Sequence, residues 1–276
     1  MMFAPIRAHQ RPDGAFLSQA AASVGRGADA GSGIATALCL ELLWPRREAP
    51  ELAPVLRAAL DYLERCEIAG QPGAYGGHAG ARGPDLRASV LISGILYRFG
   101  RRSLADLQMV YRRMLVPARI EDLGGAPMPW LDYDVFGRKA GAAGPVADLV
   151  ANLDALAMLH QLGQPMAEIP AIRLMLARGM VWAGSSMTRM RALMPDHPEP
   201  AELLWAIERA ERAGVEGLSH FAASLRRLDW LCRALETAEP PLVGCEDGQG
   251  WSCALLHDLR RGGDDAGLAP MLRRVL

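Results

Sequence analysis

The sequence lacks long apolar runs and has little excess charge. The first feature argues against a membrane-spanning protein, and the second argues against a nucleic-acid-binding protein. No stretch of the 276 residues approaches the roughly 18 uninterrupted apolar residues of a membrane span. The formal net charge of −1 gives no electrostatic footprint for nucleic acid or an anionic membrane. We therefore expect a protein with no membrane span and no nucleic-acid partner.

Cysteine is also scarce, and the number of cysteines is odd. Most of them lie inside apolar helical patterns, which suits a reducing compartment better than a disulfide framework. The N-terminal residues 1–14 contain no apolar segment of the signal-peptide type. These features predict a cytoplasmic protein. The five cysteines are Cys39, Cys66, Cys232, Cys245 and Cys253.

What the sequence does contain is helical periodicity. Leu52, Val55, Leu56, Leu60 and Leu63 recur at spacings of three and four, which predicts an amphipathic helix. Alternating apolar and polar runs between turn signals are missing, so no strand is predicted. The predicted fold class is therefore all-α. Helices are expected at about residues 34–43, 52–66, 86–99, 104–116, 147–162, 169–182, 201–213 and 219–235, two short ones follow residue 253, and residues 184–200 and 244–253 are expected to be irregular.

The predicted helices follow one another in pairs of about 40–50 residues, as in antiparallel helical hairpins. Such an array forms an open solenoid or a closed ring. Glycine-rich loops with an aromatic residue recur at 12–16 (PDGAF), 73–77 (GAYGG) and 246–251 (EDGQGW). Glycine accepts positive φ without penalty, so these loops allow a sharp turn before an inner helix. This pattern favours the ring, and we expect residues 1–276 to form one domain.

The glycine-aromatic loops resemble those of the α/α-toroid superfamily of terpenoid (squalene-type) cyclases and protein prenyltransferase β subunits. In that superfamily, Asp-Gly-x-Trp or Gln-x-x-x-Gly-x-Trp loops precede inner helices. Residues 247–251 (DGQGW) are the closer match, and residues 13–16 (DGAF) are a weaker one. The resemblance implies an α/α toroid, complete or partial.

The chain is also similar to small, single-domain bacterial members of this superfamily, which are mostly uncharacterised. The similarity rests on four short stretches whose order and spacing agree over about residues 30–165. The C-terminal third agrees only in its pairs of helices. The four stretches are Ala35-Thr36-Ala37-Leu38, Pro84-Asp85, Trp130-Leu131-Asp132 and the helix from Ala147 to Leu156.

The resemblance implies an enzyme that transfers a proton from a carboxylic acid to an apolar, isoprenoid-type substrate in a central cavity. The motif departs from the family pattern, because Asp132-Tyr133-Asp134-Val135 lacks the last acid of Asp-x-Asp-Asp. The zinc ligands of prenyltransferases and the Asp-Asp-x-x-Asp motif that holds magnesium diphosphate have no clear counterpart. We therefore predict no cofactor, and the carboxylates leave a divalent metal as an open alternative.

Residues 128–163 combine the most polar chemistry with a long apolar helix. Asp148 and Asn152 share one helix face, and Asp154 lies about 120° away. A buried carboxylate must be paired, metal-bound or protonated, and a protonated one could donate a proton to an alkene. The structural alternative is that Asp148 is an N-terminal helix charge and that Asn152 and Asp154 bond neighbouring loops.

Asp132 and Asp134 lie two positions apart in a loop, where each would raise the proton affinity of the other. That suits acid catalysis or metal binding, whereas a turn or a helix cap is the structural alternative. Five loop residues could line the mouth of a cavity and contact a substrate. They are Trp130, Tyr133, Tyr75, His78 and Trp251.

Two histidines have weaker signals. His78 lies in a glycine-rich loop and is either a ligand or base at the ring mouth or an exposed loop residue. Cys245, Cys253 and His257 have a C-x7-C-x3-H spacing that is not that of a standard zinc motif, so ordinary cysteines and a surface histidine are the alternative.

Two functions follow from the sequence. The first is a terpenoid-cyclase-like enzyme (an isomerase or lyase) with an apolar substrate. Its candidate catalytic residues are Asp132, Asp134, Asp148, Asn152 and Asp154. The second is a non-catalytic toroid that binds a hydrophobic ligand or a protein partner, and it predicts that the polar cluster is bonded internally. A weaker third possibility is acid/base chemistry on a peptide or sugar.

Overall fold

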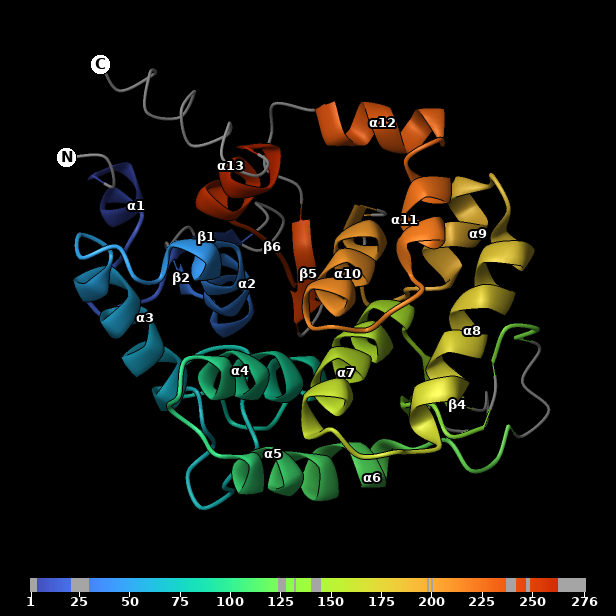
Figure 1. The fold of residues 1–276 in the computed structure, drawn as a ribbon, viewed down its shortest axis with the longest axis horizontal. Helices are drawn as coiled ribbons and strands as arrows, with labels where there is room; N and C mark the ends of the chain where they lie inside the picture. The colour runs from blue at the N-terminus through green and yellow to red at the C-terminus, as the bar shows by residue number, and fades with distance from the viewer. Residues whose placement is uncertain are drawn as a thin grey trace. The chain divides into compact units, whose positions relative to one another are not determined.

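The fold is known from a computed structural model that describes residues 4–20, 30–123, 128–131, 133–139, 145–197, 199, 201–236, 242–246 and 249–262. The described chain is mostly helical, which confirms the helical class predicted from sequence (Figure 1). It consists of two compact units, residues 1–103 with 238–276, and residues 104–237. The expected single domain stays a prediction.

The helices agree closely with those expected from apolar periodicity. Unit 1 contains α1 (Ala4–Ala8), α2 (Gly33–Leu43), the 3-10 helix η1 (Trp44–Arg46), α3 (Ala53–Arg65), α4 (Leu86–Arg98) and α13 (Ala254–Gly262). Unit 2 contains α5 (Leu104–Val110), the π-helix η2 (Tyr111–Leu115), α6 (Val116–Ala118), α7 (Leu149–Leu162), α8 (Glu168–Ala183), α9 (Met187–Ala192), α10 (Ala201–Arg212), α11 (Ser219–Leu225) and α12 (Asp229–Glu236).

Two helical predictions were wrong in detail. The segment expected to be irregular after residue 184 contains α9, whose N-cap Ser186 accepts a hydrogen bond from the backbone N–H of Arg189. A serine at this position satisfies an N–H group that the first turn leaves unpaired, which stabilises even a short helix. The single helix expected over residues 219–235 is divided into α11 and α12.

The prediction that the chain has no strands was also wrong. In unit 1, β1 (Leu17–Ala20), β2 (Ala30–Gly31), β5 (Leu242–Glu246) and β6 (Gln249–Ser252) form a sheet of order β2-β1-β6-β5 with antiparallel pairs. In unit 2, β3 (Gly137–Lys139) pairs with β4 (Pro145–Ala147). Strands of two to five residues are too short to show the alternation that identifies a strand in sequence.

Each unit is built around helices that are buried on most sides. In unit 1, α2 packs against α3, α4 and α13. All but one of the residues of α2 are buried, whereas α3 buries one face only. In unit 2, α7 has the same role and packs against α5, α8 and α10. The polar side chains at the starts of these buried helices therefore need partners within the protein.

A tight turn that ends in a buried aromatic residue occurs three times among the described residues, and we call it the aromatic turn. Its aromatic residues are Phe16, Tyr75 and Phe136. Two positions earlier, the backbone has positive φ at Gly14 (91°), Gly73 (82°) and Asp134 (62°). The carbonyl in between, of Ala15, Ala74 or Val135, accepts a backbone hydrogen bond of 2.8 Å in every case. The first two turns are glycine loops that the sequence singled out.

In all three repeats, an equivalent set of side-chain hydrogen bonds joins the aromatic turn to the buried helix that follows it. The N-cap side chains of Ser32, Asp85 and Asp148 accept from the backbone N–H three residues later. Four residues after each cap, Thr36, Ser89 or Asn152 accepts from the aromatic residue's backbone N–H, at 3.1, 2.9 and 2.8 Å respectively. The chain therefore repeats one turn-and-cap unit before α2, α4 and α7.

The short hairpins occupy equivalent places in two of these repeats. Leu17, directly after Phe16, pairs with Gly31, directly before the cap Ser32. Gly137, directly after Phe136, pairs with Ala147, directly before the cap Asp148. In these two repeats, a short strand pair therefore connects the aromatic turn to the buried helix that follows it.

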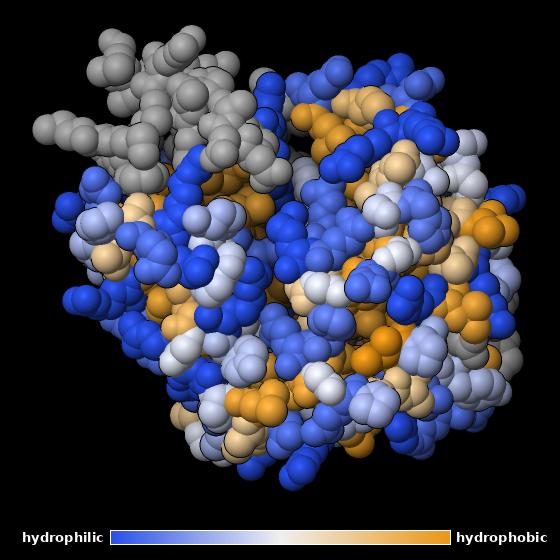
Figure 2. Space-filling view, viewed as in Figure 1, coloured by the Kyte–Doolittle hydropathy of each residue, from blue (hydrophilic) through white to orange (hydrophobic). Residues whose placement is uncertain are grey.

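No helix among the described residues is both long enough and apolar enough to cross a membrane. Figure 2 shows hydrophilic side chains over much of one face, with smaller apolar groups between them. The largest exposed fraction among the large apolar side chains of the described residues is 85%, at Val181 on α8.

Candidate functional site

Asp148 lies at the start of α7 and is only 5% exposed. Its Oδ1 accepts from the backbone N–H of Ala151 at 3.0 Å and lies 2.8 Å from Nδ1 of His197. Its Oδ2 accepts from the backbone N–H of Asp196 at 3.0 Å. Burial alone would raise the pKa of Asp148, but His197 and the backbone N–H groups outweigh burial and lower it. The carboxylate therefore stays ionised at neutral pH, which does not suit a proton donor.

Asn152 is fully buried one turn further along α7. Its Oδ1 accepts from the N–H of Phe136 at 2.8 Å, and its Nδ2 donates to the carbonyls of Phe136 at 2.7 Å and of Asp148 at 2.8 Å. This places Asn152 at the position that Thr36 and Ser89 occupy in the other repeats. Its contacts fix the third aromatic turn onto α7.

Asp154 forms a buried ion pair with Arg209 of α10. Its Oδ1 lies 2.8 Å from Nε and 2.6 Å from Nη2 of Arg209, and the exposed fractions of the two side chains are 0% and 4%. Such a pair needs close geometry because both charges have been removed from water. It joins two packed helices, α7 and α10, within unit 2.

The expected close pair of Asp132 and Asp134 stays a prediction. Asp132 lies outside the described residues. Among the described residues other than glycine, Asp134 has positive φ. Its side chain is 43% exposed, and its Oδ1 lies 3.8 Å from Nε of Arg119. The side chain of Asp134 therefore lies in a solvated environment, unlike the buried carboxylates of Asp148 and Asp154.

A second polar network involves residues that the sequence did not single out. The hydroxyl of Tyr111 donates to Oε1 of the buried Glu168 at 2.8 Å, and Nη1 of Arg119 lies 3.6 Å from the same oxygen. Burial and Glu168 raise the pKa of Tyr111, so its hydroxyl stays protonated. The positive charge of Arg119 connects this network to Asp134. This region contains the π-helix Tyr111–Leu115. A π-helix cannot be told from an ordinary α-helix by apolar periodicity, so the sequence offered no signal for this network.

The residues expected to line a cavity mouth lie in different environments. Trp130 is 4% exposed and packs against Trp182, with ring centroids 4.3 Å apart. Tyr75 is 1% exposed, and its hydroxyl accepts from Nε of Arg102 at 3.2 Å. Both are therefore core residues of their units.

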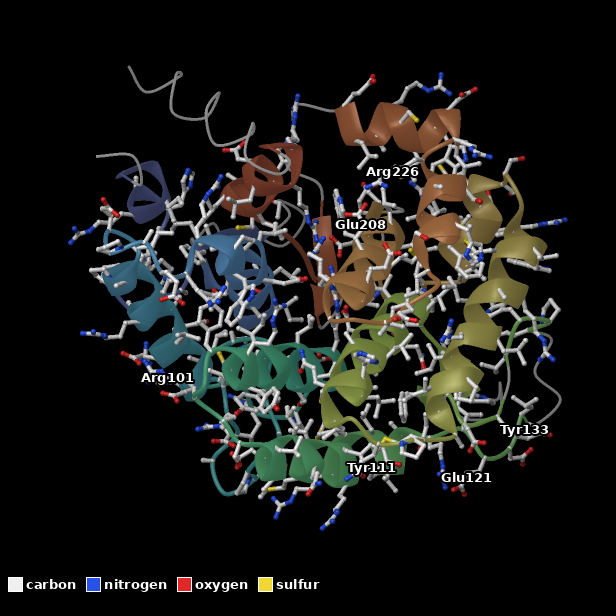
Figure 3. All side chains as sticks on the ribbon, in the orientation of Figure 1. Arg101, Tyr111, Glu121, Tyr133, Glu208 and Arg226 are labelled. Carbon is white, nitrogen blue, oxygen red and sulfur yellow. The ribbon has the colours of Figure 1, made fainter. Side chains whose placement is uncertain are left out.

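The other three residues of this set are less buried or not described. Tyr133 is 52% exposed, and Figure 3 shows it at the outer edge of the chain. His78 is an exposed loop residue, with Nδ1 3.1 Å from the carbonyl oxygen of Ala79. The backbone of Trp251 belongs to β6, and its side chain lies outside the described set.

Cys253 and His257 are buried at the start of α13, whereas the side chain of Cys245 is not among those described. Sγ of Cys253 lies 4.0 Å from Sγ of Cys39 on α2. The interaction with Cys39 and the N–H groups of Leu255 and Leu256 lower the pKa of Cys253 despite its burial. Burial and Cys253 raise the pKa of Cys39. Across the described residues, no group of three or more His, Cys, Asp or Glu side chains is arranged to hold a metal ion.

The described candidate residues thus separate into three sets. Asp148, Asn152 and Asp154 connect helices and turns inside unit 2, Asp134, Tyr133 and His78 are exposed, and Tyr75 and Trp130 belong to the cores. The chain matches no protein-family model, no curated protein and no solved structure.

Proposed function

We propose that this chain is a non-catalytic helical-hairpin protein that binds a hydrophobic ligand or a protein partner. The observation that carries the proposal is the internal bonding of the acids on α7. Asp148 contacts His197 and two backbone N–H groups, and Asp154 is paired with Arg209. A proton-transfer enzyme needs an acid that faces its substrate and is neutral before transfer. The lowered pKa of Asp148 opposes that role.

Exposed apolar side chains on α8 and α9 favour a protein partner over a small ligand. Leu174 is 42% exposed, Val181 is 85% exposed and Met187 is 40% exposed. Leu174 and Val181 are seven residues apart on α8 and therefore share a face. Leu174 and Val181 therefore offer exposed apolar area on one face of α8 that a protein partner can cover.

The repeated aromatic turns support the further proposal that the hairpins form a complete or partial α/α toroid. Each repeat places a buried helix after a turn with positive φ, as the glycine-aromatic loops of the toroid superfamily are expected to do. Small-angle X-ray scattering would test this arrangement. A scattering profile that fits an extended helical array, and no ring, would exclude the toroid without affecting the proposed binding role.

The enzyme alternative is tested with prenyl diphosphates and hydrocarbons of about ten to thirty carbons. We expect unchanged substrate in every case. A product formed by the wild-type protein, and lost in Asp132→Asn or Asp134→Asn at unchanged thermal stability, would replace our proposal with the terpenoid-cyclase-like function. Asp134→Asn is informative because the side chain of Asp134 is 43% exposed, so the variant is expected to fold, and Asp132→Asn tests the other acid of the predicted pair.

The partner proposal is tested by comparing Val181→Asp with Val116→Asp, since Val116 is also exposed, at 39%, and also lies in unit 2. A partner identified by mass spectrometry on the wild-type protein should bind Val116→Asp normally and Val181→Asp at least about tenfold more weakly. Equal binding by both variants would exclude the α8 surface.

A further inference from the structure

A surface hollow of about 470 Å³ lies in unit 1 where η1, the first half of α3 and the end of α4 meet. This volume is in the range of small-molecule sites. Its lining combines two aromatic rings with four guanidinium groups. These are Trp44, Phe99, Arg47, Arg57, Arg98 and Arg101, the last of which is labelled in Figure 3.

The two aromatic rings of the hollow pack against each other. The rings of Trp44 and Phe99 meet edge to face, with centroids 4.8 Å apart and an interplanar angle of 87°. The guanidinium carbon of Arg47 lies 4.0 Å from the Trp44 ring centroid, and that of Arg98 lies 4.7 Å from it. Two cations are thus positioned against one indole, as cation–π attraction favours.

The charge of the hollow is strongly one-sided. Glu48 is the acidic residue of the lining beside four arginines, so the lining itself is positive, although acids outside the lining compensate Arg101. Glu48 pairs with Arg47 but is 86% exposed, so this pair contributes little and a ligand can displace it. Arg101 is bonded to Asp61 at 2.9 Å and lies 3.6 Å from Glu64. Arg57 is exposed and has no ion pair with any described residue.

We propose that this hollow binds a small aromatic anion, a carboxylate or phosphate ester with one flat apolar group. Arg57 and Arg47 bind the anionic oxygens, because guanidinium groups match carboxylate and phosphate geometry. The apolar group packs against Phe99 and Leu56 on the apolar part of the lining. The inference does not depend on the proposed partner surface, which belongs to unit 2.

Isothermal titration calorimetry with phenyl phosphate tests the proposal, with inorganic phosphate and phenol as matched probes that each lack one half of the ligand. We expect phenyl phosphate to bind at least about tenfold more tightly than either. Arg57→Ala should weaken phenyl phosphate binding about tenfold or more. The control is Arg82→Ala, which removes the same charge from another exposed position in unit 1 and should leave binding unchanged.

Three outcomes would overturn the proposal. They are no binding of phenyl phosphate, equal binding by Arg57→Ala and the wild-type protein, and inorganic phosphate binding as tightly as phenyl phosphate. Arg57 is exposed, so its variant is expected to fold, and a circular dichroism melt on the same sample verifies this. Failure here would leave the α8 partner test unaffected.

Discussion

Asn152 and Phe136 exchange two hydrogen bonds, although they are 16 residues apart in the chain. The amide of Asn152 satisfies both the N–H and the C=O of Phe136, at 2.8 and 2.7 Å, and the whole contact is buried. Backbone groups that are buried without partners cost free energy, so this side chain replaces the pairing that a sheet would otherwise provide. Asn152 is therefore a structural connection between the third aromatic turn and α7.

The first prediction concerns this contact. Asn152→Ala leaves the N–H and the C=O of Phe136 without their partner, so we expect a loss of about 2–4 kcal/mol in the free energy of unfolding. Ser89→Ala, at the equivalent position of the second repeat, should have the same direction of effect. Chemical denaturation measures both. A loss below about 0.5 kcal/mol in Asn152→Ala would contradict the structural role.

The second prediction concerns backbone strain at Asp134. A non-glycine residue with φ of 62° costs about 1 kcal/mol, although aspartate tolerates this region better than most residues. We expect Asp134→Gly to be as stable as the wild-type protein or slightly more so, and Asp134→Ala to be about 1 kcal/mol less stable than Asp134→Gly. Thermal unfolding of the two variants tests this, and equal stability would show that the turn does not require positive φ.

These two sites also show what sequence can and cannot predict. Apolar spacing placed the buried helices correctly, and glycine identified the turns at Gly14 and Gly73 because only glycine takes positive φ freely. The third turn was hidden because Asp134 stands where the other repeats have glycine. The carboxylate of Asp134 was therefore interpreted as a candidate catalytic group and not as part of a turn.

The i+4 position of the repeat was hidden for a similar reason. Thr36, Ser89 and Asn152 differ in residue type, and only the contacts to the aromatic turns reveal that they are equivalent. Long-range partners, such as Arg209 for Asp154, are set by the packing of helices against each other. The local periodicity of the sequence does not predict that packing. The sequence therefore identified the polar positions of α7 but not their roles.

The third prediction is a pH dependence caused by Asp148. Its pKa in the folded protein is below the ordinary 3.8, so the ionised form stabilises the fold. This contribution is complete above pH 3.8 and is lost as the pH falls below 3.8 through the folded-state pKa. In Asp148→Asn the contribution is absent at every pH. The stability difference between the wild-type protein and Asp148→Asn should thus be present above pH 3.8 and shrink as the pH falls further into strong acid.

Urea denaturation between neutrality and strong acid measures this difference, and the exposed Asp134→Asn serves as a control. The control makes the same substitution at an exposed side chain that lacks the two backbone N–H donors bound to Asp148. A wild-type advantage over Asp148→Asn that grows as the pH falls below 3.8 would contradict the assigned direction.

The fourth prediction separates the two members of the buried ion pair. Asp154→Leu removes the carboxylate that pairs with the buried guanidinium of Arg209, and we expect a loss of about 3–5 kcal/mol. The double variant Asp154→Leu with Arg209→Met removes both charges and should be more stable than either single charge removal. Denaturation of the single and double variants in a cycle gives the coupling. Additive losses would mean that the two side chains do not depend on each other.

The last prediction concerns the thiols of Cys39 and Cys253, whose Sγ atoms lie 4.0 Å apart within unit 1. A mild dithiol oxidant such as a diazenedicarboxamide, which accepts both thiol hydrogens, should join them in a disulfide after a small side-chain movement. Because the two cysteines are 214 positions apart, the crosslink restricts the unfolded chain strongly, and we expect stabilisation of about 2–4 kcal/mol. Peptide mapping identifies the bond, and thermal unfolding with and without reductant measures its effect. Cys66→Ser should retain this response and Cys253→Ser should abolish it, whereas oxidation that lowers the unfolding temperature would show that the bond strains the contact between α2 and α13.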